Sequence, residues 1–226
     1  MRVSEAVAAR RSVRGFLTTP VDLAVLHDLA VRAARAATGG NLQPWHIDVV
    51  HGPAMTELKA IMAGKLARRE REAPGYDIYP REMSERHKAR SFAVGEQLYG
   101  HLGIPREDKA ARLGWFARNF QFFGAPAAYF CTVDRRMGPP QWADCGMYLQ
   151  NLMLLATEAG LATCAQECWA MYPETVERFL GAPPERMLFC GVAIGHEDPA
   201  DPANRLRSER AEEAEWLTVV DGPSQG

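Results

Sequence analysis

Arginine side chains gather at three places in the sequence, and arginine suits phosphate binding because its guanidinium donates two parallel hydrogen bonds. The three groups are Arg10, Arg11 and Arg14; Arg68, Arg69 and Arg71; and Arg205, Arg207 and Arg210. In the middle group, Glu70 and Glu72 are interleaved with the arginines, which indicates a solvated charged helix face. The first group adjoins Ser12 at the end of a predicted helix, where a phosphomonoester site and a solvated surface both remain open.

Two side-chain amides, Asn41 and Gln43, follow the glycine pair Gly39-Gly40 and precede Pro44-Trp45. An amide both donates and accepts hydrogen bonds, which suits a planar heterocycle with alternating donors and acceptors along its edge. The segment therefore favours a binding loop for such a ring, although taken alone it also fits an ordinary loop.

The sequence lacks the local motifs of several phosphate and metal sites. It contains no Gly-x-Gly-x-x-Gly and no Gly-x-x-x-x-Gly-Lys-Ser/Thr, so neither a Rossmann phosphate turn nor a P-loop is encoded. The six histidines form no His-x-x-x-His pair, and Cys164 with Cys168 is a single Cys-x-x-x-Cys without a second half. Because a structural zinc ion needs four such ligands, we expect no metal site and treat these thiols as small apolar residues.

The composition of the 226-residue chain, with 47% hydrophobic residues, indicates one globular domain. Its 26 basic and 28 acidic side chains give a net charge of −2, which lacks the positive field that nucleic-acid-binding proteins use. No apolar run approaches the ~18–20 residues that a membrane span needs. The five cysteines are odd in number and dispersed, which indicates reduced thiols and a cytoplasmic location.

The elements that must position these residues follow from hydrophobic periodicity and from glycine and proline breaks. Helices are predicted at 4–11, 21–38, 54–72, near 83–102, near 106–122, at 141–161 and near 173–181. Strands are predicted at 45–51, 125–133 and 187–195, with a further candidate at 216–220. This mixture predicts an α+β fold with a small sheet between helices.

Together, these pieces resemble the FMN-dependent nitroreductase family over nearly the whole chain. The resemblance is carried, in order, by Arg10-Arg11-Ser12-Val13-Arg14, Gly40-Asn41-Leu42-Gln43-Pro44-Trp45, Glu158-Ala159-Gly160-Leu161, Ala165-Gln166-Glu167-Cys168-Trp169, the strand Met187 to Gly195, and a late arginine. Within the family, the segments at 137–142, 164–169 and 187–191 look closest to nitrobenzoate-type reductases.

The resemblance implies a nitroreductase-like fold, in which a small central mixed β-sheet is flanked by helices. It also implies one domain over 1–226 and an intertwined homodimer, with 196–226 forming a C-terminal arm that reaches the partner subunit. In such proteins FMN lies at the dimer interface, and each site uses residues of both chains.

The resemblance also implies which residues of this chain contact FMN. Arg10 and Arg210 are implied to hold the phosphate, with Arg207 as a nearby candidate. Three further residues are implied to reach the phosphate, the ribityl chain or the pyrimidine edge: Arg11, Ser12 and Arg14. Those contributed by the partner chain, on the ribityl and dimethylbenzene side, are Thr38, Gly39, Asn41 and Gln43. Asn119 is the candidate for the pyrimidine edge, and the residues along the flavin N5 face are Ala165, Gln166, Glu167 and Cys168. Family members often carry proline and glycine where this chain has Ala165 and Cys168, so a small residue that fits the turn and a redox thiol both stay open for Cys168.

The implied activity is reduction of nitroaromatic or quinone-like acceptors, including nitrobenzoates, with NADPH or NADH by a ping-pong hydride mechanism. The flavin carries the chemistry, so no catalytic side chain is assigned. The partners expected are a second copy of the chain and a small aromatic substrate. The alternatives are a flavoenzyme of the same fold that dehalogenates substrates or breaks down flavin, and a flavin-binding protein without turnover.

Overall fold

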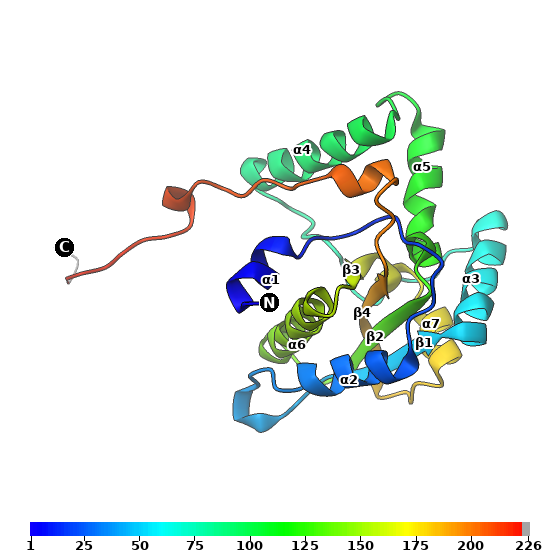
Figure 1. The fold of residues 1–226 in the computed structure, drawn as a ribbon, viewed down its shortest axis with the longest axis horizontal. Helices are drawn as coiled ribbons and strands as arrows, with labels where there is room; N and C mark the ends of the chain where they lie inside the picture. Colours follow the sequence, from blue (N-terminus) through cyan, green and yellow to red (C-terminus); the bar gives the residue numbers. More distant parts are fainter. Residues whose placement is uncertain (223–226) are drawn as a thin grey trace.

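Residues 1–222 are described by a computed structural model, in which the predicted helices and the strands predicted at 45–51, 125–133 and 187–195 follow in the predicted order (Figure 1). A further strand at 162–166 was not predicted. The helices are α1 (Val3–Ala9), α2 (Leu23–Ala33), α3 (Gly52–Ala67), α4 (Glu85–Leu102), α5 (Lys109–Ala117), α6 (Pro139–Glu158) and α7 (Pro173–Leu180). The strands are β1 (His46–His51), β2 (Ala127–Asp134), β3 (Ala162–Gln166) and β4 (Arg186–Gly195). Short 3-10 helices are η1 (Gly39–Asn41), η2 (Arg118–Gly124), η3 (Glu167–Met171), η4 (Pro202–Arg205) and η5 (Glu213–Glu215). The predicted α+β class is confirmed.

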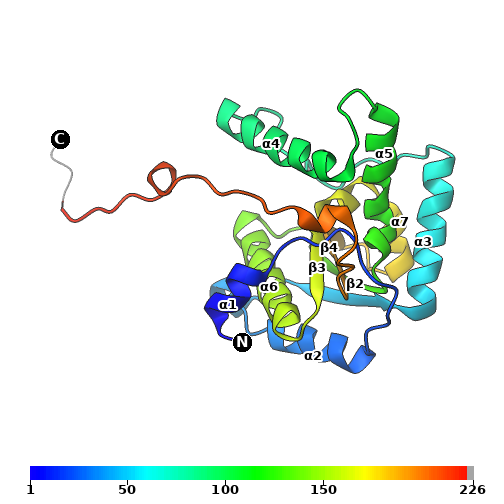
Figure 2. The same ribbon diagram turned by 45° about the horizontal axis from the view of Figure 1, so that its top comes forward.

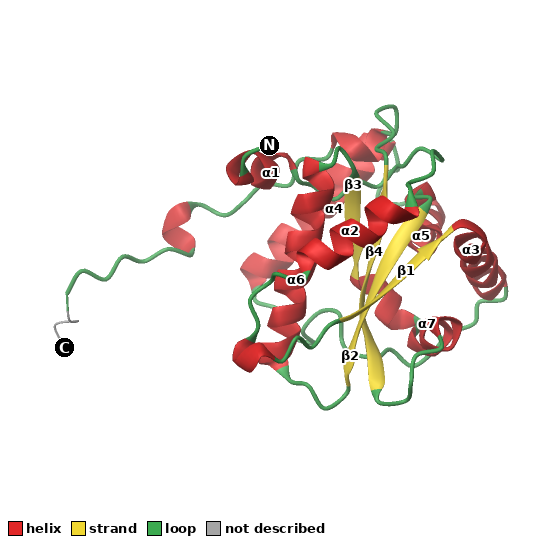
Figure 3. Cartoon of the chain, turned by 60° about the horizontal axis from the view of Figure 1, so that its bottom comes forward, coloured by secondary structure: helices red, strands yellow, loops and turns green. Residues whose placement is uncertain are grey.

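The four strands form one sheet in the order β1-β2-β4-β3, and every neighbouring pair runs antiparallel (Figure 3). This differs from the mixed sheet that the resemblance implied. Within residues 1–222, parallel pairing is limited to an isolated bridge between Ser12 and Thr163. Strand direction depends on how the long helical connections return the chain, and short-range sequence patterns do not encode that.

Helices cover both faces of the sheet, so its central strands are buried on both sides (Figure 1). Along β2, Tyr129 and Cys131 belong to the core beneath α2 and α6, whereas Ala128 and Phe130 belong to the core beneath α3, η2 and α7. A strand buried on both faces has a continuous apolar sequence, which is why the segment at 125–133 shows no alternation.

The helix predicted near 106–122 ends earlier, at Ala117, and continues as η2. Phe120, Phe122 and Phe123 are all buried there, with Phe122 at φ 51° and Phe123 at φ 53°. A regular helix points successive side chains in different directions, so it cannot bury both Phe122 and Phe123 in one core. The backbone leaves the helix because packing of these rings outweighs the strain of the left-handed conformation.

The segment with the first arginine group, residues 10–17, runs between β3 and the start of the C-terminal region. We call it the N-terminal strap. Its Val13 N–H donates to the carbonyl of Thr163 on β3 at 3.0 Å. On its other side, the Leu17 N–H donates to His196 O at 2.9 Å, within residues 196–206, which we call the arm root. The strap is therefore held on both sides by main-chain hydrogen bonds.

Beyond the arm root, residues 207–222 form an arm that extends away from the body of the chain (Figure 2). The strand predicted at 216–220 is absent from this described part. Its backbone lies beside no strand edge within the same chain, and a strand forms only when its N–H and C=O groups find partners. Trp216, Val219 and Val220 are 68%, 80% and 76% exposed.

Three further observations concern residues 1–222 as a whole. None of the helices that they form has an apolar stretch long enough to cross a lipid bilayer. No three His, Cys, Asp or Glu side chains in this range come together as a metal ion would require. All five cysteines are free and buried.

Candidate functional site

Arg10 and Arg14 place two positive charges on the strap without a carboxylate partner. Helix α1 ends at Ala9, and Arg10 continues in extended backbone with φ −59° and ψ 127°. Neither guanidinium makes an ion pair with any of residues 1–222, and the Arg14 side chain makes only a 3.5 Å contact with the Ser12 carbonyl. Both side chains are half-buried.

The charges of Arg10 and Arg14 act on the buried Cys164 thiol of β3. Burial raises the pKa of Cys164, while the Arg14 and Arg10 guanidinium groups act in the opposite direction. The strap between them is bonded to β3, since the Val13 N–H donates to Thr163 O at 3.0 Å and Ser12 forms a bridge with Thr163. Arg10 and Arg14 therefore flank a part of β3 that lies about 150 residues away in the sequence. The chain brings the strap and the end of β3 into one site.

Arg11 behaves differently from its neighbours on the strap. Its Nη2 lies 2.5 Å from Glu197 Oε2 on the arm root and also contacts the other carboxylate oxygen. The charge of Arg11 is therefore matched within the chain, and the ion pair fastens the strap to the arm root. Ser12, next to it, pairs with Thr163 in the isolated bridge.

Side chains alternate between inward and outward directions across the end of β3 and the start of η3. Ala165 and Glu167 are exposed, whereas Gln166 and Cys168 are 2% and 9% exposed. Gln166 Nε2 donates to the carbonyl of Asn119 at 2.7 Å, and Asn119 Nδ2 donates to Phe116 O at 2.8 Å. The predicted pyrimidine-edge residue and the predicted N5 segment are thus in direct contact.

Cys168 lies in the core between the sheet and η2. Burial raises the pKa of its thiol well above the ordinary value, so the sulfur stays protonated at neutral pH. A reactive cysteine needs thiolate character and access to solvent, and Cys168 has neither. The geometry favours the small packing residue over the redox thiol.

The residues predicted to come from a partner chain form a separate turn at the opposite end of α2 from the strap. Thr38 Oγ1 and the Gly39 N–H both donate to Asp144 Oδ2 on α6, at 3.0 and 3.1 Å. Asn41 and Gln43 adopt φ values of 58° and 48°, and Gln43 Nε2 donates to Asn41 Oδ1 at 3.2 Å. Within one chain the turn is bonded to α6, whereas the strap is bonded to β3 and the arm root.

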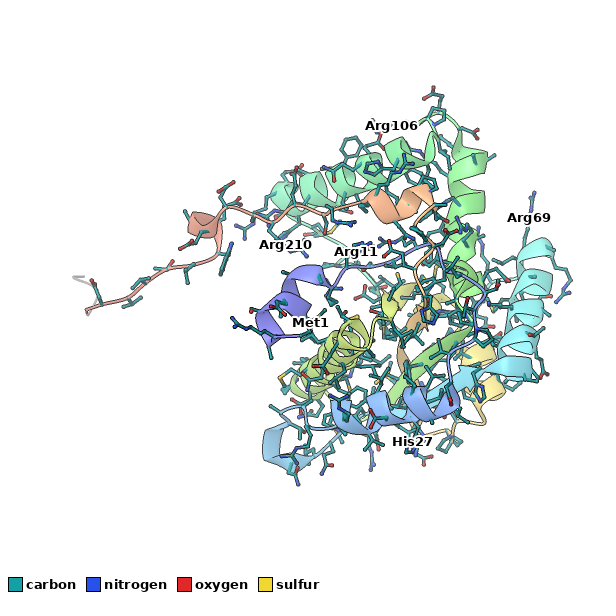
Figure 4. The ribbon with its side chains drawn as sticks, viewed as in Figure 1. Met1, Arg11, His27, Arg69, Arg106 and Arg210 are labelled. Carbon is teal, nitrogen blue, oxygen red and sulfur yellow. The ribbon has the colours of Figure 1, made fainter. Side chains whose placement is uncertain are left out.

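Arg207 and Arg210 are both exposed on the arm. Arg207 Nη1 donates to the carbonyls of Asn204 and Leu206 at 2.9 and 3.0 Å, and Arg210 Nη1 donates to Ser208 Oγ at 2.9 Å. Figure 4 shows Arg210 on the arm and Arg11 on the strap. Arg207 thus stays with the arm root, while Arg210 lies further along the arm.

The sequence and the fold were compared with known proteins. The family model described as the nitroreductase family matches residues 7–196. The chain belongs to the nitroreductase family. Its family membership confirms the resemblance and the nitroreductase-like fold.

Among its relatives in the family, the chain is 33% identical over 204 residues to a 4-nitrobenzoate reductase of Pseudomonas putida, covering 90% of this chain and 89% of the relative. It is 32% identical to a nitrobenzene nitroreductase of Ectopseudomonas oleovorans, covering 96% of each. The crystal structure of the FMN and NADPH-dependent nitroreductase NfnB from Sphigopyxis sp. strain HMH matches with a TM-score of 0.93 and 47% identity, covering 97% of this chain and 99% of that one.

The structure adds an aromatic group that the sequence analysis did not single out in this nitroreductase-family chain. Tyr76 donates its hydroxyl to the carbonyl of Phe189, and Trp142 contacts both rings at centroid distances of 5.3 and 5.6 Å. Burial raises the pKa of Tyr76, with a further contribution from Cys190 and Glu167. The group therefore borders the predicted N5 segment. Its three members come from separate parts of the chain, so no local signal identifies it.

Asp144 and Asn204 are two further polar residues that sequence reasoning missed. Both are 6% exposed. Asp144 holds the Thr38 turn, and it is the one charged residue of α6 before Glu158 at the helix end, which is a signal that could have found it. Asn204 has no comparable signal, since it lies in a polar segment where an asparagine is unremarkable.

Proposed function

We propose that this chain is an NAD(P)H-dependent FMN nitroreductase that reduces nitroaromatic compounds, including nitrobenzoates, by a ping-pong mechanism. The observation that carries the proposal is the pair Arg10 and Arg14, two unpaired guanidinium groups beside the end of β3. It is supported by the TM-score of 0.93 to a nitroreductase that depends on FMN and NADPH.

The donor set of this site fits FMN. The phosphate of FMN carries close to two negative charges, and a partly buried phosphate needs at least two cationic partners to offset its desolvation. Arg10 and Arg14 have no other ionic partner among residues 1–222, and the Arg207 side chain is bonded to main-chain carbonyls alone. All three can therefore give their charge to a phosphate without breaking an ion pair.

The remaining residues suit the rest of the cofactor. We assign Arg10, Arg14 and Arg207 to the phosphate, with Arg210 joining them from the arm, and Ser12 with Arg11 to the adjoining ribityl side. The amide of Asn119 suits a ring edge with alternating donors and acceptors. The main-chain N–H of Glu167 or Cys168 is assigned to N5, next to the exposed Ala165 and the inward Gln166.

A bound FMN would supply the hydride chemistry between nicotinamide and acceptor, and the residues of the chain would supply positioning and charge. The arginines of the strap would hold the cofactor by its phosphate and so fix its orientation. The aromatic group of Tyr76, Trp142 and Phe189 gives one side of the site an apolar wall suited to a small aromatic substrate.

We propose a homodimer, in which Thr38, Gly39, Asn41 and Gln43 complete the site of the partner subunit. Residues 1–226 are proposed to form one domain. Its C-terminal region, 196–226, which includes the arm root and the arm, is proposed to reach the partner; residues 223–226 lie outside the described part. The exposed apolar side chains of the arm support this arrangement, since such groups are usually covered. Five free thiols support a cytoplasmic location.

Anaerobic mixing tests the activity. NADPH or NADH should bleach the flavin of the purified protein, and 4-nitrobenzoate should restore its colour. Failure of both nucleotides to bleach the flavin would overturn the proposal. Steady nicotinamide consumption with an added acceptor excludes a flavin-binding protein without turnover, and analysis of the products excludes dehalogenation and flavin breakdown.

A further inference from the structure

Asn204 is a buried amide at the junction of the strap and the arm root, and all its side-chain hydrogen-bonding groups are used. Its Oδ1 accepts from the Arg14 N–H at 2.7 Å. Its Nδ2 donates to the carbonyls of Gly15 at 2.8 Å and Asp198 at 2.9 Å. The side chain thus joins two consecutive residues of the strap to the loop that begins the arm.

The main-chain carbonyl of Asn204 forms a second link. It accepts a hydrogen bond from Arg207 Nη1 at 2.9 Å. One residue is therefore bonded to the backbone of Arg14 on one side and to the guanidinium of Arg207 on the other. These two arginines are far apart in the sequence, and both are assigned to the cofactor phosphate.

The strap and the arm root meet closely enough at this point that no side chain fits between them. A Cβ added to Gly15 would lie 2.3 Å from Cβ of Asp201, well inside van der Waals contact. Asp201 is in turn held by Arg118, with Nη2 to Oδ2 at 3.0 Å, and caps the Ala203 N–H at 2.9 Å. These contacts fix the conformation of the arm root, and the amide of Asn204 sets the position of Arg14 relative to it.

We propose that Asn204 is a positioning residue of the cofactor site, which sets the separation of Arg14 and Arg207 so that both guanidinium groups reach one phosphate. It does not contact the cofactor and acts through the two arginines. This inference rests on the proposed function, because it takes FMN as the ligand.

The test compares FMN with riboflavin, which lacks the phosphate. Quenching of flavin fluorescence gives the Kd of each ligand for the wild-type protein and for Asn204→Ala. Asn204→Ala should raise the Kd of FMN about tenfold, the size expected when a charge-assisted contact is lost, while the Kd of riboflavin changes less than about twofold. An equal rise for both ligands, or no rise for either, would overturn the inference.

Two controls separate positioning from general damage. Tyr129→Phe removes one buried hydrogen bond, from its hydroxyl to Leu26 O at 2.8 Å, on the far face of the sheet, and should leave the ratio of the two Kd values unchanged. Arg207→Ala should raise the Kd of FMN less in the Asn204→Ala background than in the wild type, because Asn204 acts through Arg207. Additive effects would count against the assignment.

Asn204→Asp covers the case in which Asn204→Ala does not fold. The carboxylate has nearly the same shape and keeps the acceptor for the Arg14 N–H, but it loses both donors and adds a charge. Ala200→Asp adds the same charge at an exposed position of the arm root. Asn204→Asp should raise the Kd of FMN several-fold more than Ala200→Asp, and equal effects would overturn the inference. A wild-type protein that binds neither flavin would overturn the proposed function itself.

Discussion

Glu72 accepts two hydrogen bonds from Thr175, 103 positions away, one from the N–H at 3.1 Å and one from the hydroxyl. Thr175 lies in the first turn of α7, where no side chain of the preceding residues caps the helix. Lys65 Nζ lies 3.1 Å from the same carboxylate. The Glu72 side chain is 6% exposed, so the loop after α3 is tied to α7 through a buried, fully partnered carboxylate.

This contact predicts how stability depends on pH. Burial would raise the pKa of Glu72, but the hydrogen bonds from Thr175 and Lys65 outweigh it and hold the pKa below its usual value of 4.5. Glu72 therefore stabilises the fold above about pH 4.5, and this contribution is lost as the pH falls through the lowered pKa. Glu72→Gln should reduce the free energy of unfolding by about 1–3 kcal/mol at pH 7, and by progressively less below pH 4.5.

Urea denaturation at a series of pH values measures this difference. Glu85→Gln is the matched control, because the Glu85 side chain is 90% exposed and its pair with Lys88 lies on the surface. A difference between wild type and Glu72→Gln that stays constant from pH 7 to pH 3 would contradict the prediction.

A side chain at Gly191 on β4 should clash with its neighbours and destabilise the fold. A Cβ there would lie 2.5 Å from Cδ1 of Trp169 and 3.2 Å from Phe130, so Gly191→Ala must displace a fully buried ring. We expect a loss of about 1–3 kcal/mol in the free energy of unfolding. Gly95→Ala in α4 is the control: its Cβ meets nothing within 4 Å, and removing a helix glycine should stabilise by about 0.5–1 kcal/mol. If both variants shift the thermal midpoint in the same direction, the packing argument fails.

Arg10→Ala tests the phosphate assignment. Removing a guanidinium that bonds a phosphate should weaken FMN binding by roughly 1.5–3 kcal/mol, about a tenfold to hundredfold rise in Kd, while the protein stays folded. Arg136→Ala is the matched control, because Arg136 is 86% exposed and paired with Asp134 at the far end of β2. An Arg10→Ala protein that retains wild-type affinity for FMN in equilibrium dialysis would remove Arg10 from the site.

The exposed apolar side chains of the arm lead us to expect that the arm stabilises the proposed dimer. The side chains of Trp216, Val219 and Val220 are exposed within one chain. The arm contacts the body just before them, where Arg90 Nη2 lies 2.5 Å from Glu215 Oε2. Replacing all three with serine should shift the protein from dimer toward monomer at micromolar concentration, because the partner loses apolar contact area. Sedimentation over a concentration series measures this shift. Leu113→Ser, at a position 69% exposed on α5, should leave the dimer intact, and an unchanged dimer in the triple variant would contradict the proposed role of the arm.

Most of the secondary structure was predictable from the sequence, because hydrophobic periodicity is a local signal. The apolar runs at 125–133 and 187–195 became β2 and β4, and the nearly uncharged segment at 141–161 became α6. The prediction was wrong at η2 and at 216–220, and it did not identify the strand β3. In the first case tertiary packing of Phe122 and Phe123 overrides helix propensity, and in the second the arm finds no strand to pair with.

The candidate site was predictable only in part. The order of the motifs identifies the family, and the structure brings the strap, Asn119 and the segment from Ala165 to Cys168 together. It leaves the Thr38 turn and Arg210 apart within one chain. A residue-by-residue assignment from motifs also cannot show that Arg11 is already paired with Glu197.

The sequence by itself determined the helices, three of the four strands, the family, and the arginines and amides of the candidate site. The tertiary structure alone decided the antiparallel pairing of all four strands, the inward direction of Cys168 and the clamp that Asn204 forms between strap and arm root. The division has a physical cause. The local preference for helix or strand depends on neighbours within a few positions. The three features depend instead on contacts between residues distant in the sequence, 190 positions apart for Arg14 and Asn204, whose geometry exists only after the chain has folded.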